Sequence, residues 1–117
     1  MSVHDEAFSE LADLLGAISH PDRLKLLLEL RDAPRDVASL TAACALSQSR
    51  TSQHLGLLKA HHLVQATRDG RRVFYSLVRP ELSQWLIEGV AFLETQPGLH
   101  QSIRSLRQTY GQEEESS

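Results

Sequence analysis

An Asp-Gly pair at residues 69–70, placed between two alternating segments, constrains the fold of this chain more than any other feature. Apolar residues recur at every second position over 64–66 and again over 73–77. A period of two is that of a β-strand, and Asp-Gly is a pair that tight hairpin turns favour. The sequence therefore predicts a β-hairpin with Asp69 and Gly70 in its turn.

A pair of short helices is expected before the hairpin. Thr51, Leu55 and Leu58 form an inward-facing stripe over about residues 48–60, and Ser47 is a suitable N-cap for that helix. An alanine-rich helix is expected over about residues 37–44, with only a tight turn between the two. Two such helices followed by a hairpin predict a winged helix-turn-helix.

Further helical patterns flank this segment. They are expected over about residues 5–18, over 21–31 with Ser19 as N-cap, over 80–96, and over 99–106 as a shorter sixth helix. The predicted fold is therefore mainly α, a winged helix-turn-helix with five or six helices and a small β-hairpin. We expect one domain over residues 1–110, followed by a disordered acidic tail over 111–117.

The composition is that of an ordinary globular protein, with 41% hydrophobic and 23% charged residues in a chain of 117. No apolar run approaches the roughly 20 residues that cross a bilayer, and the N-terminus lacks the basic start and apolar stretch of a secretory signal. One cysteine cannot build a disulfide framework. We therefore expect a cytoplasmic protein that does not associate with membranes.

Charge is distributed unevenly along the chain. The formal net charge is −3, yet residues 48–79 contain six basic side chains and one acidic side chain. Phosphate groups respond to this local field rather than to the total charge. The middle of the chain is therefore predicted to present a positive surface between acidic flanks.

The helix over 48–60 and the hairpin are the candidates for contact with double-stranded DNA. The second helix of a helix-turn-helix enters the major groove, where Gln53 can pair with adenine in bidentate fashion. Arg50 and Lys59 are expected at phosphates, and the arginines of the hairpin at the backbone or minor groove. Arginines of an isolated hairpin would more simply serve solubility. The candidate DNA-binding residues are Ser47, Gln48, Ser49, Arg50, Ser52, Gln53, His54, Lys59, Arg68, Arg71 and Arg72.

Three segments resemble the ArsR/SmtB family of bacterial winged-helix repressors: residues 18–24 (ISHPDRL), 46–55 (LSQSRTSQHL) and 63–77 (LVQATRDGRRVFYSL). The resemblance covers roughly residues 6–95. It implies a homodimer whose interface is built from the first and fifth helices, with two recognition helices in successive major grooves. It also implies DNA binding that an effector or a modification weakens. The candidate interface residues are Phe8, Leu11, Leu15, Trp85, Leu86 and Leu93.

The metal sites implied by the resemblance do not match this sequence. The thiolate-rich site would fall on Asp36, Ala38 and Thr41, which supply no soft sulfur ligand. The interfacial zinc site would lie in residues 78–96, which contain no histidine and only three carboxylates, those of Glu81, Glu88 and Glu94. We therefore predict neither site, and no metal or other cofactor.

The six histidines match no standard metal-binding motif. A non-standard site that uses His4 or His100 across a dimer is left open. His54 is expected beside the DNA-binding surface, where its ionisation would make DNA binding sensitive to pH.

Cys44 is the only thiol, which excludes the intrachain disulfide of two-cysteine redox sensors. The favoured interpretation is a small buried apolar residue. Control of the protein through oxidation of Cys44 to a mixed disulfide is the alternative.

Taken together, these features predict a dimeric repressor that binds operator DNA, with an unidentified small-molecule or redox effector. The acidic flanks support a second hypothesis, a winged helix that binds another protein. An enzyme is not expected, because no Ser-His-Asp triad, paired carboxylates or phosphate-binding glycine loop can be assembled from these spacings.

Overall fold

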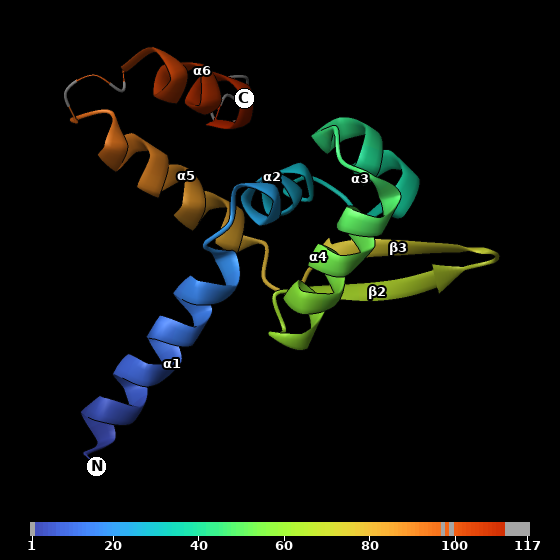
Figure 1. Ribbon diagram of the computed structural model, residues 1–117, viewed down its shortest axis with the longest axis horizontal. Helices are drawn as coiled ribbons and strands as arrows, with labels where there is room; N and C mark the ends of the chain where they lie inside the picture. The colour runs from blue at the N-terminus through green and yellow to red at the C-terminus, as the bar shows by residue number, and fades with distance from the viewer. Residues whose placement is uncertain (1, 97, 99, 112–117) are drawn as a thin grey trace. The chain divides into compact units, whose positions relative to one another are not determined.

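The computed structural model of the protein describes residues 2–96, 98 and 100–111, which form two compact units divided after Arg79. The first unit contains the winged helix-turn-helix, and the second contains two helices (Figure 1). This confirms a mainly α fold with a small β-structure. The elements are α1 (Val3–Ile18), α2 (Pro21–Glu29), β1 (Arg35–Asp36), α3 (Val37–Cys44), α4 (Gln48–Ala60), β2 (Val64–Asp69), β3 (Arg72–Leu77), α5 (Glu81–Leu93) and α6 (His100–Gly111).

The predicted hairpin is part of a three-stranded antiparallel sheet in the order β1-β3-β2. Asp69 pairs with Arg72 at the end of the ladder, so Asp69 closes β2 and the turn itself is formed by Gly70 and Arg71. Gly70 has a φ of 66°, a left-handed conformation that costs little for glycine. The added strand β1 pairs Arg35 with Tyr75 and Asp36 with Phe74.

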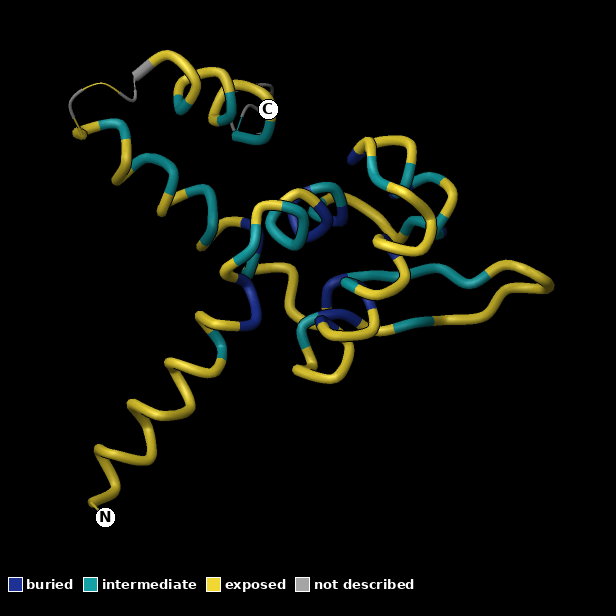
Figure 2. The backbone as a smooth tube through the Cα atoms, in the orientation of Figure 1, coloured by how far each residue is buried: buried dark blue, intermediate teal, exposed yellow. Residues whose placement is uncertain are grey.

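The core of the first unit lies between α2, α3, α4 and the sheet. The predicted stripe on α4 is confirmed, because Thr51, Leu55 and Leu58 are fully buried. Figure 2 shows that most of α1, in contrast, is exposed, and only its C-terminal end is buried. The other fully buried large side chains of the described residues are Leu26, Leu27, Leu40 and Val64.

Three side chains cap α2, α3 and α4. Ser47 Oγ accepts the Arg50 N–H at the start of α4, as predicted, and Asp36 Oδ1 accepts the Ser39 N–H at the start of α3. The prediction for α2 was wrong by one residue. His20, and not Ser19, is the N-cap, and its Nδ1 accepts the Asp22 N–H at 3.0 Å.

The second unit consists of α5 and α6. The apolar pattern predicted a sixth helix that ends near residue 106, but α6 continues to Gly111, so residue 111 belongs to a helix. The rest of the expected acidic tail lies outside the described residues. None of the described helices is long and apolar enough to cross a membrane.

Candidate nucleic-acid interface

The turn between α3 and α4 is held by hydrogen bonds on both of its sides. Ala45 has a left-handed φ of 55°, and the Leu46 N–H donates to the Thr41 carbonyl at 3.1 Å, which closes the end of α3. The Thr41 hydroxyl donates to Thr51 Oγ1, and the Thr51 hydroxyl donates to the Ser47 carbonyl, each at 2.9 Å. These bonds join the two helices and the turn, so they set the orientation of α4 relative to α3.

The face of α4 opposite its buried stripe is exposed and polar. It offers hydroxyl, amide and cationic groups, the types that bind base edges and phosphates. The structure therefore brings most of the candidate DNA-binding residues onto one helix surface. Its exposed members are Gln48, Ser49, Arg50, Ser52, Gln53 and Lys59, with Ser47 exposed at the N-cap.

The three arginines near the hairpin turn have different surroundings. Arg68 and Arg71 are exposed at the end of the hairpin. The side chain of Arg72 is also largely exposed, but it forms an ion pair with Asp36. Its Nε donates to Asp36 Oδ2 at 2.9 Å, and its guanidinium lies 5.3 Å from the centre of the Phe74 ring. This pair was not predictable from a local pattern, because 36 residues separate its members. Arg72 therefore connects the hairpin to the start of α3.

Two hydrogen-bond donors stabilise the charged form of the Asp36 carboxylate. The Ser39 N–H and the Arg72 guanidinium both donate to it, and they hold the pKa of Asp36 below its usual value of 3.8. Asp36 therefore acts as a helix cap and as the anchor of Arg72 at the same time.

His54 does not share the exposed face of α4. Its side chain is only 12% exposed, and its Nε2 lies 3.6 Å from Asp22 Oδ2 at the start of α2. Its Nδ1 lies 3.5 Å from Arg23 Nη1, and its ring centre lies 4.6 Å from that of His20. Burial, followed by the charges of His20 and Arg23, lowers the pKa of His54 below 6.5, so its imidazole is neutral at neutral pH. The structure places His54 beneath the polar face rather than on it.

This contact between α2 and α4 is the grouping that the sequence reasoning missed. His20 and Asp22 lie two residues apart, but His54 follows more than 30 residues later, and no short motif links such positions. Arg50 extends from the same helix toward this group, with Nη1 3.9 Å from Asp22 Oδ2. The one usable signal was the presence of a histidine inside an otherwise exposed polar helix face.

Comparisons with known proteins agree on one family. The family described as "Bacterial regulatory protein, arsR family" matches residues 20–66. The chain is also 35% identical over 85 residues to the transcriptional regulator NmtR of Mycobacterium tuberculosis, an alignment that covers 73% of this chain and 71% of NmtR. The chain belongs to the ArsR family.

Two further proteins extend the comparison. The chain is 36% identical over 86 residues to the transcriptional repressor SmtB of M. tuberculosis, and it spans 64% of the length of that protein. The solution structure of the homodimeric winged helix-turn-helix DNA-binding domain of Mb0332 from Mycobacterium bovis has a TM-score of 0.69 to this chain at 25% identity, and it covers 86% of this chain and 95% of that domain. The winged helix-turn-helix predicted from the sequence is thereby confirmed.

The residues that the ArsR resemblance assigned to a dimer interface lie on helices with exposed apolar side chains. On α1, Phe8 is 70% exposed, and Leu11 and Leu15 are also exposed. On α5, Trp85 and Leu93 are exposed and Leu86 is half-buried. Each helix therefore presents apolar surface that is not covered within its own unit.

Cys44 lies at the end of α3 and is 4% exposed. Burial, with a smaller contribution from the charge of Glu29, raises the pKa of the Cys44 thiol to about 11. The thiolate is the reactive form of cysteine, so this environment suppresses reaction with oxidants at neutral pH. Cys44 therefore packs as a small apolar residue.

The structure also places His4 and the three positions named for the thiolate-rich metal site. His4 is exposed on α1, and the side chain of His100 lies outside the described residues. Asp36 is engaged with Ser39 and Arg72, as described above. Ala38 is exposed on α3, and the Thr41 hydroxyl bonds to Thr51.

Proposed function

We propose that this ArsR-family chain is a sequence-specific transcriptional repressor that binds double-stranded operator DNA as a homodimer. The observation that carries the proposal is the division of α4 into two faces. One face is fully buried in the core, and the other exposes amide, hydroxyl and cationic groups. Because its buried face packs against the core, α4 can present its polar face to a DNA groove without moving relative to the rest of the unit.

The proposed contacts follow from the exposed side chains. Gln53 reads a base in the major groove, while Arg50 and Lys59 bind phosphates. Arg68 and Arg71 at the hairpin end bind the backbone or the adjacent minor groove. We expect Arg72 to contribute less to DNA affinity than Arg71, because its charge is already paired with Asp36.

We infer the homodimer from two lines of support. The apolar side chains of α1 and α5 are exposed in the single chain, and apolar surface of this kind is typically covered in an assembly. The related domain of Mb0332 is homodimeric. To enter successive major grooves, the two copies of α4 in a two-fold symmetric dimer have to lie about 34–36 Å apart, one turn of DNA.

The proposed function also includes where the protein acts and how its DNA binding is controlled. A protein that acts on chromosomal DNA works in the cytoplasm of a bacterium, and we propose no catalytic activity and no cofactor for DNA binding itself. We propose that an unidentified small-molecule effector controls DNA binding, with redox control as the alternative. Redox control through Cys44 is disfavoured by the burial and the raised pKa of its thiol.

The test is a gel shift with the DNA upstream of the gene that encodes the protein. We expect Gln53→Ala to weaken binding to this DNA by about tenfold or more, the scale of one lost bidentate base contact. The matched control is Gln108→Ala, which removes the same side chain from the exposed surface of α6. The proposal fails if no upstream fragment binds more tightly than random DNA at moderate salt. It also fails if both variants weaken binding equally.

A further inference from the structure

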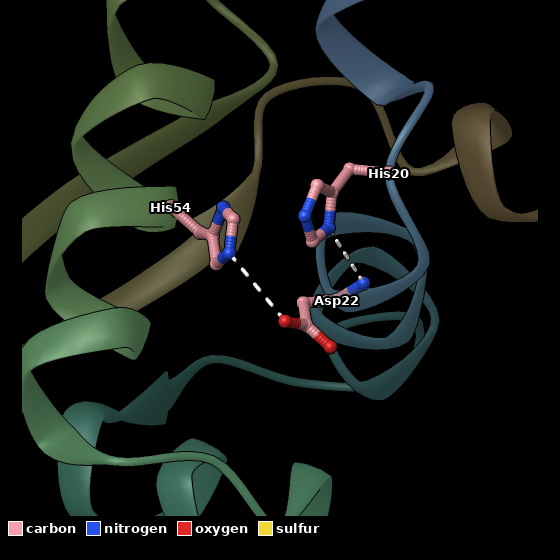
Figure 3. A group of neighbouring side chains, drawn as sticks. All are labelled: His20, Asp22 and His54. Atoms are coloured by element: carbon pink, nitrogen blue, oxygen red, sulfur yellow. Dashed lines mark hydrogen bonds and ion pairs between the residues drawn. The ribbon is translucent and has the colours of Figure 1, made fainter.

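His20, Asp22 and His54 point toward one another from two helices that lie far apart in the sequence (Figure 3). One potential metal-ligating atom from each of the three side chains lies within 4.8 Å of the other two. His20 and Asp22 belong to the start of α2, and His54 to the middle of α4. The three side chains thus converge on a common point between the two helices.

We propose that His20, Asp22 and His54 bind one divalent transition-metal ion of the Zn²⁺ type. Two imidazole nitrogens and one carboxylate oxygen are a donor set that Zn²⁺ and its first-row neighbours accept. With bonds of about 2.0–2.2 Å, the ligand atoms of a tetrahedral ion lie about 3.4 Å apart. The separation of 3.6 Å between His54 Nε2 and Asp22 Oδ2 already matches that spacing. Three protein ligands leave the fourth position to water.

The surroundings of the three side chains favour coordination. The side chains of Asp22 and His54 are only 13% and 12% exposed, so few water molecules compete for them. A metal ion binds imidazole through a ring nitrogen that carries no proton, and Nε2 of His54 lies 3.6 Å from the Asp22 carboxylate with which it would share the ion. The negative charge of Asp22 would be compensated directly by the ion.

Two arginine side chains also face this site, and both have to move when a metal ion binds. Arg50 approaches Asp22 at 3.9 Å, but its side chain is 66% exposed and is able to turn into water. Arg23 approaches His54 Nδ1 at 3.5 Å and is held by hydrogen bonds to the Ala17 and Gly16 carbonyls. When Nε2 of His54 binds an ion, the ring proton moves to Nδ1, so the contact with Arg23 must open slightly.

Binding at His20 has a specific structural consequence. Nδ1 of His20 accepts the Asp22 N–H and thereby caps α2. If Nε2 of a neutral His20 binds the ion, Nδ1 carries the ring proton and cannot accept that hydrogen bond. Metal binding therefore removes the acceptor of the Asp22 amide. Metal binding at exposed histidines elsewhere on the protein would leave the hydrogen bond of the Asp22 amide unchanged.

The experiment is a titration of the purified full-length protein with Co²⁺, whose visible absorption reports coordination, followed by displacement with Zn²⁺. We expect one site per chain. The loss of an outer-shell partner typically weakens metal binding about 10–100-fold. We expect a larger loss of Co²⁺ affinity for each of the three ligand variants, His54→Gln, His20→Gln and Asp22→Asn. The control is the double variant His61→Gln with His62→Asn, which removes two exposed histidines at the end of α4. Asparagine suits residue 62 because its φ is 60°.

The outcomes separate the proposal from its alternatives. The proposal is overturned if the wild type binds no Co²⁺, or if the control variant loses binding while the three site variants retain it. Circular dichroism checks that each variant is folded. If a site variant does not fold, NMR of the wild type decides: Zn²⁺ must shift the ring nitrogens of His20 and His54 and the amide of Asp22. If the NMR signals of these groups do not change when Zn²⁺ is added, the proposed site is overturned. None of these measurements involves DNA, so their result is independent of the proposed operator binding.

Discussion

Replacement of Leu58 by alanine tests whether this side of α4 packs against the core of the first unit. Leu58 is 0% exposed, whereas its neighbour Leu57 is 37% exposed. The two positions differ by about 100° around the helix, so they face different surroundings although their side chains are identical. Leu57→Ala is therefore a matched control for Leu58→Ala.

The expected magnitudes follow from burial. The substitution removes three carbon groups, each worth about 0.8 kcal/mol when fully buried. The cavity left at Leu58 adds to this loss, so we expect Leu58→Ala to lower the free energy of unfolding by about 3–4 kcal/mol. At Leu57 part of the side chain is already in water and solvent can fill the space. There we expect a loss of about 1.5 kcal/mol or less.

The assay is urea unfolding followed by circular dichroism. Wild type and variants are compared at one protein concentration, because the stability of a dimer depends on concentration. The change in free energy is taken from the midpoint and slope of each transition. A loss at Leu57 that equals or exceeds the loss at Leu58 would refute the assigned orientation of α4.

Three further predictions concern other parts of the first unit. Arg71→Ala should weaken binding to the upstream DNA and reduce the slope of log affinity against log salt by about 1, as measured by fluorescence anisotropy; an unchanged slope would show that Arg71 contacts no phosphate. Asp36→Asn should lower the melting temperature at neutral pH. The lowered pKa means that the charged carboxylate stabilises the fold above pH 3.8 and loses this effect as the pH falls through the folded value. The melting temperatures of wild type and Asp36→Asn should therefore converge in acid, and a constant difference would contradict this. Cys44 should remain unmodified by mild peroxide in the native protein and react only after unfolding, as mass spectrometry can determine.

Much of the fold was predictable because its signals are local. The period of two around residues 69–70, the stripe on residues 48–60 and the cap at Ser47 each depend on residues a few positions apart. Local errors were small. The cap of α2 is His20 instead of Ser19, and Asp69 belongs to β2 rather than to the turn. In both cases, two adjacent residues were able to fill the same role, and backbone geometry selected one.

The candidate site was only partly predictable. The polar face of α4 follows from the helical period, once the buried stripe is known. The different roles of Arg71 and Arg72 do not, because Arg72 finds its partner Asp36 across the sheet. Strand β1 was also missed, since two residues are too few to show a period.

The sequence by itself determined the succession of helices and hairpin and the residue types on the surface of α4, because those properties repeat over a few residues. Only the tertiary structure decided which side chains are paired and which are exposed. Asp36 forms an ion pair with Arg72, and the packing of α2 against α4 places His20 and Asp22 beside His54. Such contacts join residues more than 30 positions apart, and they arise when the buried leucines of the core bring the helices and the sheet together. That packing turned a histidine expected beside the DNA-binding surface toward the start of another helix.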